Sequence, residues 1–224
     1  MSRNTREPAG SAGSIRYIAV EGPIGVGKTV LAELLAGRLE ARFVKEAVDE
    51  NPFLPRFYTD MQKFAFQTQV FFLLSRHRQL RELIQMGLFE QRVVSDYLFD
   101  KDRIFASLNL TEHEFALYER IYEVVRTEVP KPDVVVYLQA RTEVLLARIR
   151  RRGRSFEQNI DEHYLESLSE LYNSFFLRYE DAPLLIVNTD RLNYVTSRSE
   201  FERLLEAIQE TRHGRRFYAA GCGK

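Results

Sequence analysis

A short segment near the start of the chain combines the residue types that hold phosphate groups. Glycine, four residues, glycine, lysine and threonine follow one another in Gly22-Pro23-Ile24-Gly25-Val26-Gly27-Lys28-Thr29. Glycines let backbone amides approach an anion, and a helix that begins there points its positive end at the same place. Lys28 can then reach the β- and γ-phosphates, and the Thr29 hydroxyl can ligate magnesium. The pattern predicts a nucleoside triphosphate site, without choosing among kinases, GTPases and ATPases.

Five arginines surround Gly153 in the second half of the chain: Arg148, Arg150, Arg151, Arg152 and Arg154. In isolation such a cluster is typical of a solvated helix end, where the helix dipole favours cations. Together with a phosphate loop, it predicts a lid that closes over the nucleotide, with Gly153 as its hinge. Transfer of a phosphoryl group needs cations on the developing charge, so we expect Arg148 and Arg152 to contact phosphate and Arg150 to face solvent.

Two carboxylates follow predicted strands. Glu46 ends the second strand, at the edge of the sheet that lines the crevice in folds of this class, where it could accept a proton from a primary alcohol. Taken alone, it would be an ordinary exposed glutamate. Asp96 follows the third strand and is the candidate for an acid linked to magnesium, together with Thr29. The alternative for Asp96 is a helix cap.

The order of strands and helices is typical of an α/β fold. Apolar runs predict five strands, at residues 15–20, 43–44, 92–95, 134–138 and 184–187. Helical spacing predicts helices at 28–39, 62–86 (ended by Gly87), 102–108, 112–127, 143–151 (capped by Thr142), 159–179 and 199–212. Alternating strands and helices predict a five-stranded parallel sheet with helices on both faces, a P-loop kinase fold with an arginine-rich lid.

Length and composition fit one globular domain. The 224 residues are 45% hydrophobic and 29% charged, with a formal net charge of zero, so the chain as a whole predicts neither a nucleic-acid nor a membrane partner. We place the domain at residues 15–212, after a disordered polar leader at 1–14 and before a loose basic tail at 213–224.

The single cysteine, Cys222, excludes an internal disulfide and a cysteine metal cluster. No run is apolar enough for a membrane span or a secretory signal, so the cytoplasm is the expected location.

Motifs along the chain resemble the deoxyribonucleoside kinase family, particularly the bacterial deoxyadenosine/deoxyguanosine kinases. The resemblance extends from Tyr17 to about Tyr194. Its motifs occur in the family's order at residues 21–29 (EGPIGVGKT), 46–52 (EAVDENP), 63–69 (KFAFQTQ), 75–76 (SR) and 148–158 (RIRRRGRSFEQ).

The resemblance implies roles for individual residues. Glu46 matches the general base that activates the sugar's 5′-hydroxyl, Tyr58 the tyrosine that binds the 3′-hydroxyl, and Glu157 its acidic partner. Gln69 matches the amide that pairs with the base, in preference to Gln67, and Arg76 the arginine that helps to set specificity. The lid positions fall on Arg148, Arg152 and Arg154, and Phe66 or Phe71 could wall the base pocket. The family also implies ATP with Mg²⁺ and a homodimer packed through helices.

The sequence departs from the family pattern in two places. An acid, an arginine and a serine usually follow the third strand, whereas this chain has Ser95-Asp96-Tyr97. Asp96 is then either the family's acid, which would contact the substrate, or the alignment slips by one residue. Lys101 or Arg103 could supply the missing cation, and the sequence leaves open whether Asp100 or Asp102 faces the base. In addition, Ala47 replaces the proline that commonly follows the catalytic glutamate.

Three functions are compatible with these patterns. The first is transfer of the γ-phosphoryl group of ATP to the 5′-hydroxyl of a deoxynucleoside, with a purine preferred on the resemblance alone. The second is a nucleoside monophosphate kinase such as thymidylate kinase, in which Arg76 would hold the acceptor phosphate. The third is a nucleotide-binding subunit without catalysis, although binding alone would not require Lys28, Glu46 and the lid arginines together.

Overall fold

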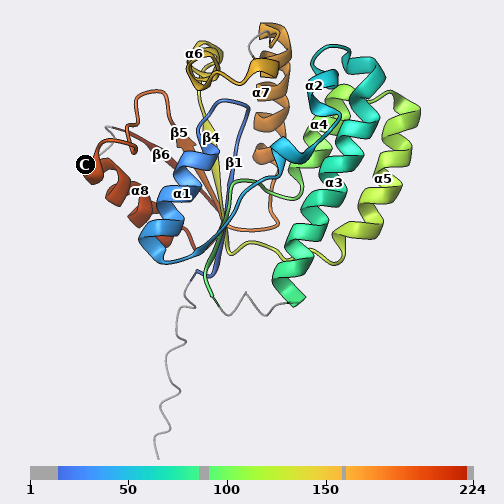
Figure 1. Cartoon of the computed structure of the whole chain (residues 1–224). Coiled ribbons are helices and arrows are strands. Elements are labelled where there is room, and N and C mark those ends of the chain that lie inside the picture. The colour runs from blue at the N-terminus through green and yellow to red at the C-terminus, as the bar shows by residue number, and fades with distance from the viewer. Residues whose placement is uncertain (1–14, 86–90, 158–159, 221–224) are drawn as a thin grey trace, which may run out of the picture.

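The computed structural model describes residues 15–85, 91–157 and 160–220, coloured along the chain in Figure 1. Its strands are β1 (Tyr17–Glu21), β2 (Arg42–Val44), β3 (Val93–Ser95), β4 (Val134–Gln139), β5 (Leu184–Asn188) and β6 (Arg215–Ala219). Its α-helices are α1 (Lys28–Leu39), α2 (Leu54–Phe57), α3 (Met61–Gln85), α4 (Lys101–Asn109), α5 (Glu112–Arg126), α6 (Thr142–Arg152), α7 (Glu162–Leu177) and α8 (Arg198–Glu210). Single 3₁₀ turns lie at Val48–Glu50 and Ser155–Glu157.

The predicted leader at 1–14, the helix end at Gly87 and Cys222 lie outside the described residues. Within the described ranges, no helix has both the length and the apolar character that a membrane crossing would need.

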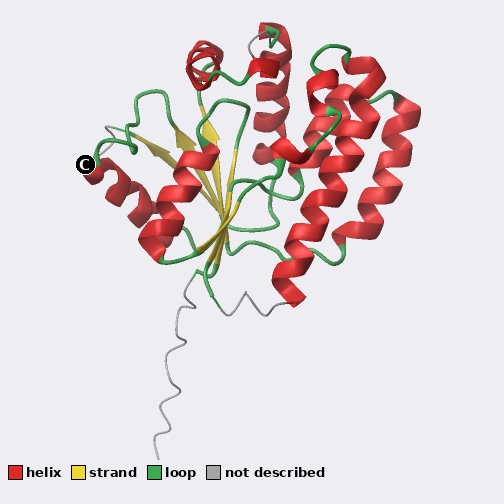
Figure 2. Cartoon of the chain, viewed as in Figure 1, coloured by secondary structure: helices red, strands yellow, loops and turns green. Residues whose placement is uncertain are grey.

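The strands form one parallel sheet in the order β2-β3-β1-β4-β5-β6 (Figure 2). The predicted parallel α/β architecture is confirmed, but the predicted number of strands is wrong, since the sheet has six strands instead of five. The sixth, β6, pairs with β5 in the register Leu184↔Arg215 and lies in the segment predicted to be a loose tail. Its sequence begins with two arginines, and Phe217 is 76% exposed, so this edge strand lacks the apolar pattern of a buried strand.

Helices cover both faces of the sheet, as the strand and helix order predicted. On one face, α1 and α8 pack on the sheet through Leu31, Leu35, Leu204 and Ile208. On the other face, α3, α4, α5 and α7 bury a second set of apolar and aromatic side chains, which includes Leu73, Leu80, Tyr118, Tyr172 and Phe176. Both faces of the sheet are therefore buried in hydrophobic cores. This explains why β1 and β4 consist almost entirely of apolar residues.

The lid helix α6 begins differently from the prediction. Thr142 was expected to cap it, but Thr142 is its first helical residue and Arg141 precedes it as the N-cap, without a side-chain capping bond. Arg141 is instead fixed by Asp190, which accepts its backbone N–H at 2.9 Å and its Nε–H at 3.0 Å. A tertiary contact across 49 residues thus sets the start of α6 in place of a local cap.

The parallel sheet places the carboxyl ends of its strands along one edge. β1 runs directly into Gly22 of the phosphate loop, and Asp96 follows β3 without an intervening residue. Glu46 comes two residues after β2. Because β3 lies between β2 and β1 in the sheet, these segments meet at a single place, which is the usual ligand crevice of an α/β sheet.

Packing of α1 on the sheet makes a stability prediction. Leu35 is fully buried on α1, whereas Val30 on the same helix is 42% exposed. Truncation of a fully buried leucine to alanine costs about 2–5 kcal/mol. We therefore expect Leu35→Ala to lower the free energy of unfolding by that amount in urea titrations, and the control Val30→Ala to change it by less than about 1 kcal/mol. Equal effects of the two variants would contradict this packing.

Candidate active site

The phosphate loop joins β1 to α1 and has a backbone that only glycine adopts easily. Gly25 has φ 84° and Gly27 has φ 107°, both in the region that side chains disfavour. A Cβ on Gly25 would lie 2.7 Å from Ile149 Cγ1 and 2.9 Å from the carbonyl of Leu145. Gly27 is also the N-cap of α1 and has no side chain to occupy the first amides of the helix. The loop and the helix end therefore present backbone N–H groups to an anion, as predicted from the sequence.

Lys28 lies along the loop. Its Nζ donates to the carbonyls of Gly22 at 2.7 Å and Pro23 at 3.2 Å. Burial, together with the charge of Lys101, lowers the pKa of Lys28 to about 8. A bound phosphate would stabilise the protonated form of Lys28, because the anion compensates a buried charge that the protein itself only partly stabilises.

Glu21 forms hydrogen bonds that fix the start of the phosphate loop, a role that the sequence did not predict. Its side chain is fully buried. Oε1 accepts the N–H of Gly22 at 2.8 Å and the hydroxyl of Tyr172 at 3.1 Å, and Oε2 accepts the N–H of Leu98 at 2.8 Å. Glu21 thus joins the phosphate loop to the segment after β3 and to α7. Its position as the first residue of the resembling motif was the only available signal.

Asp96 connects the phosphate loop to Glu46. Its Oδ2 accepts the Thr29 hydroxyl at 2.6 Å, and its Oδ1 accepts the backbone N–H of Glu46 at 2.7 Å. Asp96 is 3% exposed. Its two oxygens therefore fix the distance between the helix that begins at the loop and the segment that carries the candidate base.

The Glu46 carboxylate is held between two cations. Arg76 Nε donates to Oε1 at 2.9 Å, Arg76 Nη2 also contacts Oε1, and Lys101 Nζ lies 2.9 Å from Oε2. The side chains of Glu46, Arg76 and Lys101 are 9%, 3% and 6% exposed. Burial alone would raise the pKa of Glu46, but the charges and hydrogen bonds of Arg76 and Lys101 hold it well below its ordinary value. Glu46 is therefore a carboxylate throughout the physiological range.

The acceptor side of the site is built on α3. Gln69 and Arg76 are both buried and lie two turns apart on this helix, whereas Gln67 is exposed. Arg76 also forms an ion pair with Asp102 on α4, and its guanidinium lies 5.0 Å from the centre of the Phe72 ring. Asp102 keeps one buried oxygen, Oδ2, without a hydrogen-bond partner within the described part of the chain. Of the two aspartates left open by the sequence, Asp102 is the one that joins this cluster.

The lid arginines divide into two groups. Arg148 Nη1 donates to the carbonyl of Val26 at 3.0 Å and to Thr189 Oγ1 at 2.9 Å, and its Nη2 donates to the Thr189 carbonyl at 2.7 Å. Arg152 pairs with Glu157, and Arg154 Nη1 lies 3.5 Å from the same carboxylate. Arg148 is thus fixed against the phosphate loop, while the other two lie beyond it. Phosphate contact by the three arginines stays a prediction, and Arg150 is exposed as expected.

Tyr58 lies next to the end of the lid. Its ring stacks on Phe156, with ring centres 5.8 Å apart and an interplanar angle of 25°. Burial raises the pKa of Tyr58 well above its ordinary value, and the charge of Glu157 raises it further. Phe156, on which Tyr58 stacks, directly precedes Glu157, so the two predicted residues lie near each other, and their shared role stays a prediction.

The departures from the family pattern have a structural answer. Lys101 reaches Glu46, whereas Arg103 turns away and pairs with Glu119, at 2.9 Å from Nε and 2.8 Å from Nη2. Tyr97 follows Asp96, where the family usually has an arginine. Of the two candidate cations, Lys101 is therefore the one that contacts Glu46.

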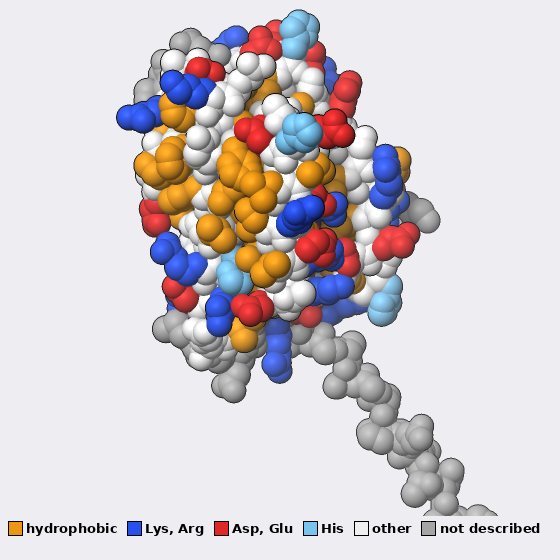
Figure 3. Space-filling model, turned by 90° about the vertical axis from the view of Figure 1, so that its right-hand side faces the viewer, with side chains coloured by type: hydrophobic (Ala, Val, Ile, Leu, Met, Phe, Trp, Pro, Cys, Tyr) orange, Lys and Arg blue, Asp and Glu red, His pale blue; other side chains and the backbone are white. Residues whose placement is uncertain are grey.

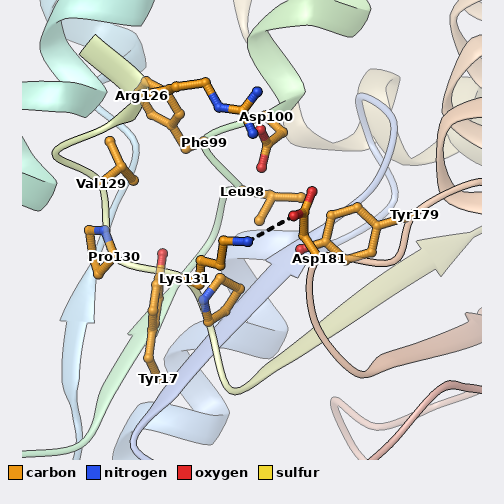
Figure 4. A pocket seen from close by; sticks show the side chains of 11 residues that line it. Tyr17, Leu98, Phe99, Asp100, Arg126, Val129, Pro130, Lys131, Tyr179 and Asp181 are labelled. Atoms are coloured by element: carbon orange, nitrogen blue, oxygen red, sulfur yellow. Dashed lines mark hydrogen bonds and ion pairs between the residues drawn. The ribbon is translucent and has the colours of Figure 1, made fainter. Parts of the chain in front are cut away.

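Asp100 lies outside the cluster around Glu46 and Arg76. It accepts the Tyr122 hydroxyl and lines a cavity of about 60 Å³ with Tyr17, Tyr179 and the ion pair of Lys131 and Asp181, at 2.9 Å (Figure 4). None of the predicted site residues lines this cavity. A volume of this size accommodates one or two water molecules, far less than the several hundred Å³ typical of small-molecule sites. The cavity is therefore not the nucleotide pocket.

Thr29 and Asp96 suit a divalent cation beside the phosphates. Their side-chain oxygens are 2.6 Å apart at the start of α1, and both atoms are hard oxygen ligands. No cluster of three or more His, Cys, Asp or Glu side chains that could hold a metal by themselves occurs among the described residues. One or two protein oxygens of this kind, together with the phosphates of a nucleotide, are the usual ligands of a divalent cation at nucleotide sites.

Gly25 gives the sharpest test of the phosphate loop. Gly25→Ala forces a Cβ into Ile149 and Leu145 at a φ that alanine resists, so we expect binding of ATP with Mg²⁺ to weaken at least tenfold in titration calorimetry. The matched control is Gly37→Ala in the interior of α1, where a Cβ would meet nothing within 4 Å. That variant should bind ATP normally. Its free energy of unfolding should rise by about 0.5–1 kcal/mol, because alanine favours the helix more than glycine does. Normal binding by Gly25→Ala would remove this loop as the phosphate site.

Comparisons with known proteins agree with this geometry. Residues 18–212 match the family model described as deoxynucleoside kinase. The chain is 36% identical to the deoxyguanosine kinase of Bacillus subtilis, over 87% of this chain and 96% of that one. It is 32% identical to the deoxyadenosine kinase of Lactobacillus acidophilus, over 88% and 96%. It also superposes on the structure of deoxyadenosine kinase from M. mycoides with bound dCTP, with a TM-score of 0.74, 28% identity and coverage of 86% and 98%. The family resemblance seen in the motifs is confirmed, and this chain belongs to the deoxynucleoside kinase family.

Proposed function

We propose that this chain transfers the γ-phosphoryl group of ATP to the 5′-hydroxyl of a deoxynucleoside, in the reuse of nucleosides as nucleotides. One observation carries the proposal: a buried glutamate, Glu46, stands at the sheet edge and is joined through Asp96 to Thr29 at the phosphate loop. A donor half-site and a proton acceptor are thereby held at a fixed separation. Such positioning is most of what an enzyme contributes to phosphoryl transfer.

The residues divide the work of the reaction. Backbone amides of residues 22–27, Lys28 and the lid arginines hold the triphosphate. Thr29 and Asp96 would hold a Mg²⁺ ion, which would supply charge neutralisation at the transferred group. Glu46 orients the 5′-hydroxyl and accepts its proton, while Tyr58 and Glu157 hold the 3′-hydroxyl.

A purine deoxynucleoside is the proposed acceptor. The relatives named above are a deoxyguanosine and a deoxyadenosine kinase, which supports deoxyguanosine and deoxyadenosine. Gln69 offers an amide, and Asp102 Oδ2, which has no hydrogen-bond partner within the described residues, offers an acceptor; both kinds of group can bind the edge of a base.

The thymidylate kinase alternative loses its main support. It required Arg76 to be available for an acceptor phosphate, but Arg76 is 3% exposed and already paired with both Glu46 and Asp102. A second anion would have to displace one of two buried ion pairs. An acceptor without a phosphate therefore suits the site better.

A homodimer belongs to the same proposal. Apolar side chains gather on the side of the molecule formed by α3 and α5 (Figure 3). Val124 on α5 is 73% exposed, and Leu117 on α5 and Leu74 on α3 are 50% and 46% exposed. A patch of this kind on helices is typical of an interface, and we propose that a second copy of the chain covers it.

The interface can be tested with a charge. Val124→Glu would bury a carboxylate against apolar side chains, so we expect the particle mass in light scattering to fall from that of two chains to that of one. The control, Val195→Glu, changes a residue that is 59% exposed in the segment between β5 and α8, and should leave the mass unchanged. A single-chain mass for the unmodified protein would refute the dimer.

The catalytic role of Glu46 can be tested with a neutral isostere. Glu46→Gln should lower kcat on the order of 10²–10⁴-fold, because the proton acceptor is lost, while binding of ATP with Mg²⁺ stays within about threefold. The matched control is Glu202→Gln, which removes only a surface pair with Arg38 at 3.0 Å and should keep full activity. Retained turnover of Glu46→Gln would exclude the base role. If the unmodified protein phosphorylates none of the four deoxynucleosides with ATP and Mg²⁺, the proposed function is wrong.

A further inference from the structure

Lys101 is a buried cation in a place that does not favour one. It is the first residue of α4 and is 5% exposed. The first turn of a helix carries the positive end of the helix dipole, so a cation there is unfavourable unless an anion compensates it. The compensating anion is Glu46, whose Oε2 lies 2.9 Å from Lys101 Nζ. The site therefore retains a charge that the helix alone would exclude.

The hydrogen bonds at Glu46 show where an acceptor hydroxyl can bind. Oε1 receives two donors from Arg76, Nε and Nη2, which occupy both of its lone pairs. Among the residues that the structure describes, Oε2 receives one donor, Lys101 Nζ, which leaves its second lone pair for a ligand. A 5′-hydroxyl that donates to Glu46 must then donate to Oε2, directly beside the Lys101 ammonium.

Lys101 is connected to the phosphate loop through Glu46 and Asp96. Its Nζ lies 2.9 Å from Glu46 Oε2, and Asp96 accepts both the backbone N–H of Glu46 and the hydroxyl of Thr29 at the start of α1. In agreement with this arrangement, the charge of Lys101 lowers the pKa of Lys28. A γ-phosphoryl group held at the loop would therefore meet the 5′-oxygen close to Lys101.

We propose that Lys101 is a catalytic residue of this chain, whose ammonium group contacts the attacking 5′-oxygen and the phosphoryl group as it is transferred. The inference rests on the proposed function. In the step, the proton of the 5′-hydroxyl passes to Glu46 Oε2 and a bond forms between the 5′-oxygen and the γ-phosphorus. The bond from that phosphorus to the β,γ-bridging oxygen breaks, and ADP leaves with the electron pair. Lys101 stabilises negative charge on the oxygens throughout.

The kinetic test uses three substitutions at Lys101 and one control. Lys101→Met removes the charge at similar length, and we expect kcat to fall on the order of 10²–10³-fold, the loss typical of one donor to a developing anion. The KM for the deoxynucleoside should change by less than about fivefold, because the contact forms mainly in the transition state. Lys101→Arg restores a cation and should recover at least about tenfold of the lost kcat. Arg103→Met, which removes the pair with Glu119 and the contact with the Tyr122 ring but no contact with Glu46, should keep the original kcat.

The split between kcat and KM separates this role from a purely structural one. A disturbed site would raise the KM for the deoxynucleoside and weaken the binding of ATP along with kcat, whereas the loss of a contact made in the transition state lowers kcat and leaves both within about fivefold.

Each outcome decides the role of Lys101. A folded Lys101→Met protein with kcat within about threefold of the original overturns the role. If that variant fails to fold in thermal melts, Lys101→Gln keeps a hydrogen-bond donor to Glu46 without the charge, and full kcat in it has the same meaning. Absence of turnover in the unmodified protein on all four deoxynucleosides removes the proposed function and this role with it. If the unmodified protein turns over normally and Lys101→Met keeps the same kcat, only the catalytic role of Lys101 is refuted and the proposed function stands.

Discussion

The carboxylate of Asp96 is the contact on which the site depends. One oxygen accepts the Thr29 hydroxyl at the start of α1, and the other accepts the backbone N–H of Glu46 beyond β2. Strands β1, β3 and β2 are adjacent, so this one side chain fixes the ends of three neighbouring segments relative to one another. A charge-assisted hydrogen bond to a backbone amide is strong and directional, which suits a part that sets a distance.

Partners of opposite charge and hydrogen bonds explain how so many ionisable groups remain buried together. Four carboxylates meet three cations in this part of the molecule: Glu21, Glu46, Asp96 and Asp102 with Lys28, Arg76 and Lys101. Isolated burial of any one of them would be costly, but each has a partner of opposite sign or a hydrogen bond. A triphosphate with its divalent cation would add further charge of both signs on the side of Lys28. The site is therefore already organised electrostatically for a reaction in which charge moves from one oxygen to another.

The sequence predicted most of the fold, because strong local patterns dictate it. The segment from β1 through α1 follows from glycine spacing and apolar runs, and the predicted bounds of α1 agree with the structure. β6 escaped prediction since an exposed edge strand with two arginines has no buried face. Thr142 was misread because a long-range bond from Arg141 to Asp190, which no local pattern reveals, sets the start of α6. Likewise, sequence spacing left Lys101 and Arg103 equivalent, and only the rotation of α4 about its axis distinguishes them.

The anchoring of Arg148 has a consequence for the mechanics of the lid. Its guanidinium bonds to Val26 in the phosphate loop and to Thr189 after β5, so the middle of α6 is clamped to the body of the protein. Gly153, at φ 73°, ends the helix one turn later. With Gly153 as the predicted hinge, the part that would pivot is the short segment after it, which carries Arg154, and not a whole domain. Such a segment would order few residues as it closes, so the exchange of nucleotides would not need a large rearrangement.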